Sequence, residues 1–240
     1  MDSHIQQPSR TEVWKMFNRV APRYDLLNRI LSLGIDRLWR RKMTSFLPPR
    51  EKQHVLDLAT GTADQLLSLF ENRNEIKSAT GMDLADRMLH IGRKKVERAG
   101  LSDVITLKIG SATDIAANDQ EFDAVTISFG IRNVADTTQS LREIYRVLKP
   151  GGRLLVLEFS LPKSPLFCNI YLFYLRHILP KVGAFLSKDP YAYRYLNETI
   201  ETFPCGEAFR RILKLAGFTA IAVHPLTFGI ATIYQGDRPE

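Results

Sequence analysis

The stretch HVLDLATGTADQ, from His54 to Gln65, decides the fold of this chain. It begins with an apolar run typical of a buried strand, breaks at Thr60-Gly61-Thr62, and continues into a helical pattern. A second apolar run, residues 79–82, ends on Asp83. A strand, a glycine turn, a helix and a strand that ends in an acid are typical of the nucleotide-binding half of a doubly wound sheet, where the acid binds ribose hydroxyls.

The turn after the first strand does not suit a diphosphate. A dinucleotide site needs three glycines so that backbone amides can close on the pyrophosphate, whereas this turn has only Gly61. A P-loop is excluded because no Gly-Lys-Ser/Thr follows the turn. Asp57 and Asp64 flank the turn, and their carboxylates would repel phosphates but attract a ligand that carries an ammonium and a sulfonium. The sequence therefore predicts S-adenosylmethionine, with its ammonium on Asp57 and its ribose on Asp83.

The remaining cofactor-binding candidates lie in the turn and at two later strand ends. Gly61 and Thr62 would let the backbone approach the methionine moiety. Ser111 and Ala112 follow the third predicted strand, where class I methyltransferases contact the adenine, although Asp or Asn is more usual in place of Ser111. Ser128 ends the fourth predicted strand, and it either reaches the methionine portion or makes an ordinary strand-end hydrogen bond.

Strands and helices alternate through the middle of the chain. Strands are predicted near residues 53–59, 77–83, 103–109, 121–129 and 151–159, with helices between them near 62–72, 86–99 and 136–148. This alternation implies a parallel sheet with right-handed crossovers. A helix near 205–216 follows, then two strands near 218–224 and 227–235 whose short link at Pro225 favours an antiparallel hairpin. The predicted fold is the α/β, seven-stranded, Rossmann-like sheet of class I methyltransferases, with its last strand antiparallel.

Residues 1–240 are expected to form a single domain, which is long enough to bury a full core. Residues 1–48 are predicted to form an N-terminal helical lid over the cofactor, and residues 161–203 an aromatic-rich helical insertion after the fifth strand. In the lid, Trp39 and its basic neighbours are predicted to form a packed helix with a basic outer face; these neighbours are Arg37, Arg40, Arg41 and Lys42.

Charge and cysteine content indicate where the protein works. The two cysteines are too few for a disulfide framework, and residues 1–10 contain no apolar stretch typical of a secretory signal, so a cytoplasmic location is expected. The net charge of +7 suits a nucleic acid, an anionic membrane surface, or a basic face exposed to solvent without a partner. The apolar stretch 166–179 is interrupted by polar residues and is too short to span a bilayer.

Two classes of methyltransferase chemistry are disfavoured. The five histidines are scattered without ligand spacing, so no metal site is expected, which argues against metal-assisted catechol O-methylation. Ser128-Phe129-Gly130-Ile131 occupies the place after the fourth strand where an Asp/Asn-Pro-Pro-Tyr motif would indicate amino-methylation of nucleobases.

Three segments together resemble the UbiE/MenG family of quinone C-methyltransferases. They are residues 24–28 (YDLLN) followed by Ser32, Gly34, Arg37 and Trp39; residues 128–134 (SFGIRNV); and residues 146–154 (RVLKPGGRL) continuing to 158–160 (EFS). The chain departs from the family at Leu27, which replaces a methionine, and at Asp36, which replaces a histidine. Asp36 is therefore assigned no catalytic role.

The resemblance implies methylation of a ring carbon of a polyprenylated quinol, and demethylmenaquinol is the favoured substrate. The alternatives are the ubiquinone-pathway benzoquinol, 2-methoxy-6-polyprenyl-1,4-benzoquinol, and a different small-molecule or sterol C-methyltransferase. From other classes, a non-catalytic S-adenosylmethionine-binding module and an RNA-binding protein remain open. RNA binding is disfavoured because the basic residues are spread along the chain and are not interleaved with aromatics.

The chemistry that the resemblance implies requires an electron-rich ring. Ionising a phenol of pKa ~10 at pH 7 costs on the order of 4 kcal/mol, so the site needs a base or a positive charge. Arg132 is predicted to stabilise the phenolate and Asn133 to bind the same oxygen; the alternative is that Arg132 pairs with Asp136 on a surface loop. Tyr24 and Asp25 are predicted to contact substrate or cofactor, or else to form a turn with a capping aspartate.

The insertion carries too many apolar residues for a helix with one buried side. Part of residues 161–203 is predicted to form a channel for the polyprenyl tail and to contact the inner face of the membrane. The alternative is that these residues pack into the core or into a homodimer interface.

Overall fold

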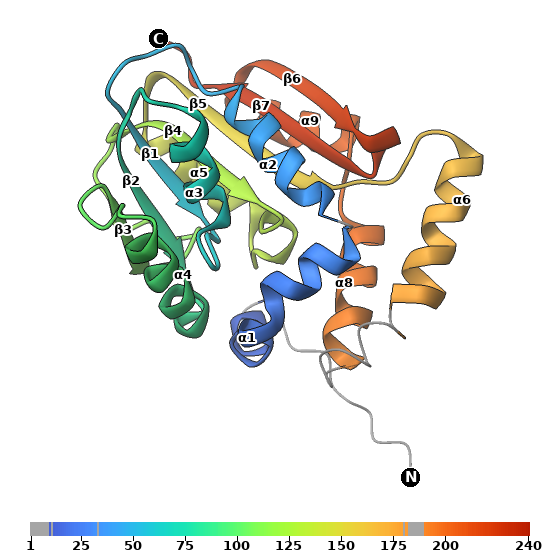
Figure 1. Ribbon diagram of the computed structural model, residues 1–240. Helices are drawn as coiled ribbons and strands as arrows, with labels where there is room; N and C mark the ends of the chain where they lie inside the picture. Colours follow the sequence, from blue (N-terminus) through green and yellow to red (C-terminus); the bar gives the residue numbers. More distant parts are fainter. Residues whose placement is uncertain (1–9, 11, 33, 180, 182–189) are drawn as a thin grey trace.

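The computed structural model describes residues 10, 12–32, 34–179, 181 and 190–240. They contain a seven-stranded sheet in the order β3-β2-β1-β4-β5-β7-β6 (Figure 1). The strands are β1 Gln53–Leu58, β2 Ile76–Asp83, β3 Ile105–Ile109, β4 Phe122–Ser128, β5 Leu148–Phe159, β6 Thr219–Leu226 and β7 Ala231–Asp237. The first five pair in parallel, and β7 runs antiparallel to both β5 and β6. The predicted class I methyltransferase sheet, with its closing hairpin and antiparallel last strand, is confirmed.

Helices cover both faces of the sheet because successive residues of a buried strand point to opposite sides. Leu56 and Leu58 of β1 belong to the same core cluster as α5 (Thr137–Val147) and α9 (Glu207–Leu215). Val55 belongs to the opposite cluster, with α2 (Ile35–Thr44), α3 (Asp64–Asn72) and α4 (Asp86–Arg98). The near-continuous apolar run of β1 is thus explained by burial on both sides.

The predicted N-terminal helical segment consists of two helices, α1 (Val13–Leu31) and α2. Gly34 lies before α2 with φ 76°, a left-handed conformation that glycine adopts without steric cost, and the chain changes direction there. α2 lies over α3 on one face of the sheet, whereas α1 lies beyond the strand ends (Figure 1). Residues 1–9, 11 and 33 of the predicted lid are outside the described residues.

The predicted insertion after β5 contains α6 (Pro165–Phe173), a π-helical turn η2 (Tyr174–Ile178) and α8 (Pro190–Thr202). Residues 180 and 182–189 of the insertion lie outside the described part of the chain. Figure 1 shows α1, α8 and α6 gathered along one side of the sheet. Of the helices that the structure describes, none has the length and apolar character needed to cross a bilayer.

Candidate active site

The loops that follow β1 and β4 approach each other closely. Ala59 and Phe129, the first residues after these strands, both have left-handed φ values, 49° and 57°. A Cβ on Gly130 would lie 2.5 Å from the Cβ of Ala59, so only glycine fits between the loops. Non-glycine residues rarely adopt left-handed conformations. Where they do, the residues are often found at active sites and ligand-binding sites. Both cavities described below open from this junction.

The first cavity, here the cofactor cavity, has a volume of about 240 Å³. Its lining includes seven residues predicted from the sequence, namely Tyr24, Gly61, Asp83, Ser111, Ala112, Ser128 and Asn133. Leu84 and Met88 contribute apolar walls, which suit a flat base. Asp83 and Arg10 are the charged members of its described lining.

Asp83 is held in place by backbone amides. The N–H of Gly61 donates to its Oδ2 at 2.8 Å, and the N–H of Ala85 donates to its Oδ1 at 2.8 Å. Burial raises the pKa of this carboxyl, and the amide hydrogen bonds oppose the rise. Each carboxylate oxygen keeps a further lone pair, so Asp83 can accept hydrogen bonds from a bound ligand.

Asp57 and Thr62, both predicted to bind the cofactor, are not in the described lining of this cavity. Asp57 is 1% exposed and accepts a hydrogen bond from Thr126 Oγ1 at 2.6 Å. Burial raises its pKa to about 6, although hydrogen bonds from Thr126 and Thr60 and the charge of Arg40 oppose the rise. Thr62 is also buried, and its hydroxyl donates to Asp25 Oδ1 at 2.6 Å. Asp57 therefore binds a side chain of β4, and Thr62 binds a side chain of α1.

Asp25 ties the lid to the turn. In addition to Thr62, it binds Lys95 Nζ at 2.6 Å, and Lys95 also binds Asp64 Oδ1 at 2.5 Å. Arg29 of α1 binds Asp64 Oδ2 at 2.8 Å, which adds a second link between the lid and the start of α3. The structure gives Asp25 two partners and does not place it on either cavity.

The second cavity, here the aromatic cavity, has a volume of about 130 Å³. Its aromatic walls are Phe17, Tyr24, Trp39, Phe129, Phe159, Tyr171, Tyr174 and Tyr195. Its charged residues, within the described lining, are Asp36, Arg40 and Arg132. Leu175, Leu179, Leu196, Ile200 and Ile230 give it an apolar wall, while Asn28 and Ser32 add polar groups. A flat ring with polar substituents and an apolar chain would match these surfaces.

Arg132 is a buried cation of the aromatic cavity. It donates through Nη1 to Glu158 Oε1 at 2.5 Å and to the carbonyl of Phe129 at 2.7 Å. Its guanidinium lies 5.3 Å from the ring centroid of Phe159. The alternative pairing with Asp136 is wrong, because Asp136 caps α5 by accepting from the N–H of Gln139 at 2.9 Å.

Glu158, the buried partner of Arg132, was not singled out from the sequence. It is fully buried, and burial raises its pKa while the charge of Arg132 lowers it. Its position near the end of the fifth strand, in a matched motif, was the available signal. Asn133, by contrast, lines the cofactor cavity, so it and Arg132 face different cavities.

Tyr24 and Phe129 line both cavities, and with Phe17 they mark where the two adjoin. Burial raises the pKa of the Tyr24 hydroxyl, which is therefore neutral near pH 7. Tyr24 also packs edge-on against Phe17, with ring centroids 6.1 Å apart. The prediction that the lid residue Tyr24 contacts cofactor or substrate remains consistent with this position.

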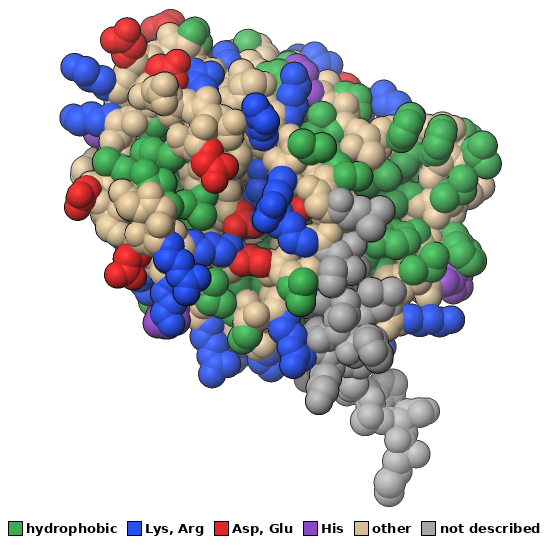
Figure 2. All heavy atoms as spheres, in the orientation of Figure 1, with side chains coloured by type: hydrophobic (Ala, Val, Ile, Leu, Met, Phe, Trp, Pro, Cys, Tyr) green, Lys and Arg blue, Asp and Glu red, His purple; other side chains and the backbone are tan. Residues whose placement is uncertain are grey.

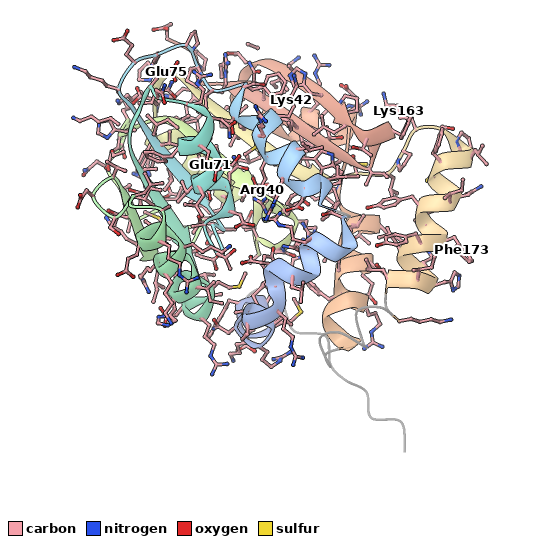
Figure 3. The ribbon with its side chains drawn as sticks, viewed as in Figure 1. Arg40, Lys42, Glu71, Glu75, Lys163 and Phe173 are labelled. Carbon is pink, nitrogen blue, oxygen red and sulfur yellow. The ribbon has the colours of Figure 1, made fainter. Side chains whose placement is uncertain are left out.

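The prediction that Arg40 lies on the basic outer face of α2 is wrong. Arg37, Arg41 and Lys42 are exposed, but Arg40 is 7% exposed and lines the aromatic cavity with Asp36. Figure 3 shows Arg40 on α2, near the junction of α2, α1 and the strand ends. No group of three or more His, Cys, Asp and Glu side chains arranged to hold a metal ion occurs within the described residues.

Comparison with known proteins identifies relatives along nearly the whole chain. The model of the ubiE/COQ5 methyltransferase family matches residues 5–238. The demethylmenaquinone methyltransferase of Thermus thermophilus is 46% identical over 93% of this chain and 100% of its own length. That of Bacteroides fragilis is 42% identical over 95% and 92%. The ubiquinone/menaquinone biosynthesis C-methyltransferase UbiE of Geotalea daltonii is 42% identical over 95% and 96%.

Solved structures share the fold at lower identity. An S-adenosylmethionine-dependent methyltransferase of Thermotoga maritima aligns with a TM-score of 0.66 and 18% identity, covering 95% of this chain and 100% of that one. Phosphoethanolamine N-methyltransferase 2 of Haemonchus contortus aligns with a TM-score of 0.60 and 18% identity, covering 82% and 51%. These similarities establish the class I methyltransferase fold alone.

Asp83→Asn should weaken S-adenosylmethionine binding, because one acceptor oxygen for the ribose hydroxyls is replaced by an amide donor while the shape is kept. The expected loss is roughly 1.5–3 kcal/mol, about tenfold to a hundredfold in Kd, measured by titration calorimetry. Asp86→Asn, on the exposed start of α4, is the matched control and should bind normally. Unchanged affinity in Asp83→Asn would show that Asp83 does not hold the ribose.

Asp57→Asn should stabilise the protein at neutral and higher pH. Because the pKa of Asp57 is raised from 3.8 to about 6 by folding, its ionised form costs stability above about pH 6, on the order of 3 kcal/mol. That cost fades as pH falls from about 6 to 4, where Asp57 becomes protonated in the folded protein. Urea unfolding without cofactor at several pH values measures the difference, with exposed Asp103→Asn as control. A difference that does not change with pH would contradict the raised pKa.

Proposed function

Because the chain belongs to the ubiE/COQ5 methyltransferase family, we propose that it methylates a ring carbon of demethylmenaquinol in menaquinone biosynthesis. It is an S-adenosylmethionine-dependent methyltransferase. The relatives named demethylmenaquinone methyltransferase support the naphthoquinol substrate. Relatives named for both pathways support the ubiquinone-pathway benzoquinol as a second candidate.

One observation carries the proposal: the cofactor cavity and the aromatic cavity meet at Tyr24 and Phe129. Methyl transfer requires the donor and the attacked carbon to lie in line and nearly in contact, and adjoining cavities permit this. The residues present fit S-adenosylmethionine, because an amide-held carboxylate faces a cavity with apolar walls for the base. When bound there, S-adenosylmethionine supplies an electrophilic methyl group.

Arg132 would stabilise the ionised quinol oxygen next to the attacked carbon. Its guanidinium is a planar, delocalised donor group, and its Nε has no hydrogen-bond partner among the described residues. Glu158 and the carbonyl of Phe129 fix the guanidinium plane through Nη1, so Arg132 needs no rearrangement to bind the oxyanion. Tyr24, neutral and placed between the cavities, would orient the ring toward the methyl donor.

The apolar wall of the aromatic cavity would hold the first isoprene units of the substrate. Leu175 and Leu179, on η2 and just after it, lie on this wall with Leu196 and Ile200 of α8. Burying isoprene units against these side chains contributes roughly 25 cal/mol per Å² without any polar contact. Residues 161–203 would thus form the tail-binding part of a single domain, with residues 1–48 as the lid.

The opposite side of α6 supports a membrane contact. Leu166, Phe167, Ile170, Phe173, Ile178 and the neighbouring Phe228 are exposed large hydrophobic residues. Figure 2 shows this apolar group on the right of the view, over α6, and Figure 3 places Phe173 and Lys163 at the outer edge. Exposed Lys163 and Lys181 flank the group, and cations beside an apolar patch suit anionic lipid headgroups. The cytoplasmic face of the membrane, where a polyprenyl quinol is dissolved, is the proposed partner.

Arg132→Lys should lower kcat with little change in KM. Lysine keeps a charge that can pair with Glu158 but lacks the planar fork, so the oxyanion loses a donor. The expected fall in kcat is on the order of 10²-fold. Steady-state kinetics with demethylmenaquinol and with the benzoquinol would measure it. A variant with near-normal kcat would exclude this role for Arg132.

Changing exposed α6 residues should affect only substrates that reside in a bilayer. The double variant Leu166→Ser, Phe173→Ser should bind vesicles of zwitterionic and anionic phospholipid more weakly and lower kcat/KM for a long-tailed quinol in them, by roughly tenfold. Its activity on a tail-less quinol in solution should stay normal. Wild-type protein should prefer the long-tailed quinol.

Two results would contradict the tail and membrane assignments. Equal kcat/KM values for tail-less and long-tailed quinols would show that residues 161–203 do not form a channel for the polyprenyl tail. If the double variant instead converts a dimer to a monomer and binds vesicles normally, these residues form a subunit interface.

A further inference from the structure

A second buried cation faces the aromatic cavity. Arg40 is 7% exposed, and within the described part of the protein its Nε has no hydrogen-bond partner. The nearest carboxylate oxygen, Asp36 Oδ2, lies 3.9 Å from Nε, which is an ion-pair distance but too long for a hydrogen bond. Burying a guanidinium with an unsatisfied N–H costs free energy, so its retention at a cavity indicates a ligand.

Arg40 and Arg132 are placed alike. The guanidinium of Arg40 lies 5.3 Å from the ring centroid of Phe129, and that of Arg132 lies 5.3 Å from the ring centroid of Phe159. The two phenyl rings are neighbours, with centroids 4.5 Å apart. Two neighbouring phenyl rings of the cavity, those of Phe129 and Phe159, therefore each have a guanidinium over them.

A 1,4-quinol also carries two oxygens, on opposite edges of a flat ring. We propose that Arg40 is a second substrate-binding residue, which donates to the quinol oxygen opposite the one that Arg132 stabilises. This inference rests on the proposed function. Since the opposite oxygen is not next to the methylated carbon, Arg40 contributes orientation and specificity for a ring with two oxygens, whereas Arg132 contributes activation.

Asp36 is the positioning residue for Arg40. It is 4% exposed, accepts a hydrogen bond from Ser32 Oγ at 2.8 Å, and forms an ion pair with Arg29. With these contacts made, Asp36 Oδ2 lies 3.9 Å from the Nε of Arg40, so the Nε–H is not hydrogen-bonded to it.

The competing explanation is that Arg40 serves only the fold. The charge of Arg40 opposes the rise that burial causes in the pKa of Asp57, and it contributes to the lowered pKa of Asp64. It therefore helps to keep both carboxyl groups ionised. A structural role of this kind would affect every substrate and the cofactor equally. A role in binding the second oxygen would affect only substrates that carry it.

The test compares two ring substrates in Arg40→Met. One is a short-tailed 1,4-naphthoquinol, and the other is the matched 1-naphthol without the opposite hydroxyl. The variant should lose about 10–100-fold in kcat/KM for the quinol, mostly through KM, and change less than about twofold for the naphthol, so the preference of the wild type disappears. Exposed Arg41→Met, on the same helix, should retain the preference.

Calorimetry with S-adenosylmethionine separates a binding role from misfolding. Normal cofactor affinity in Arg40→Met, with selective loss for the quinol, supports the inference. If cofactor affinity falls in Arg40→Met, the same two substrates are compared in Arg40→Lys. This variant keeps the charge beside Asp36 but lacks the planar guanidinium, so it should also lose the preference for the quinol. Equal losses for both substrates would overturn the inference. If the wild type methylates neither ring, the proposed function fails and the inference with it.

Discussion

The arrangement of both cavities depends on the close approach of the loops after β1 and β4. These strands are neighbours at the point where the strand order reverses, and ligands of open α/β sheets bind there. The loops fit together because Ala59 and Phe129 turn left-handed and Gly130 leaves room for the Cβ of Ala59. This turn aims the ring of Phe129 between the two cavities and its carbonyl at Arg132. One backbone constraint therefore lies between the cofactor cavity and the aromatic cavity and helps to position Arg132.

Buried charge is the second organising feature of the site. Arg132 with Glu158, and Arg40 with Asp36, are taken out of water at a cost that ion pairing only partly offsets. A fold under selection for stability alone would gain by replacing such pairs with apolar residues of similar volume. A quinol that must ionise needs fixed cations in a dry environment, where their effect on an oxyanion is much larger than in water. The cost to stability is consistent with catalysis by a preorganised site.

Local sequence spacing pointed to several residues that line the cofactor cavity, although Asp57 and Thr62 lie outside its described lining. It did not single out Arg40 at the aromatic cavity or Glu158, the partner of Arg132. Gly61, Asp83, Ser111 and Ser128 follow strands directly, so the strand pattern alone places them at one edge of the sheet. Arg40 was missed because the run Arg40-Arg41-Lys42 looks uniformly exposed. It shares a helical face with Asp36 and Met43, four and three residues away, and these are buried. Glu158 was missed because its partner, Arg132, is distant in sequence, and only the pairing of β4 with β5 brings the two together.

The insertion connects the chemistry to its proposed environment. α6 is apolar nearly all round, which is unusual for a helix at the surface of a protein, and Arg176 and His177 follow only in η2. On one side Tyr171 and Leu175 are buried against the aromatic cavity, and on the other Ile170 and Phe173 are exposed. A helix that is apolar on both sides could line a binding site on one side and, under the proposed function, rest on lipid on the other. The proposed place of α6, between a bilayer and the aromatic cavity, would account for a sequence pattern that does not suit a helix with one buried side.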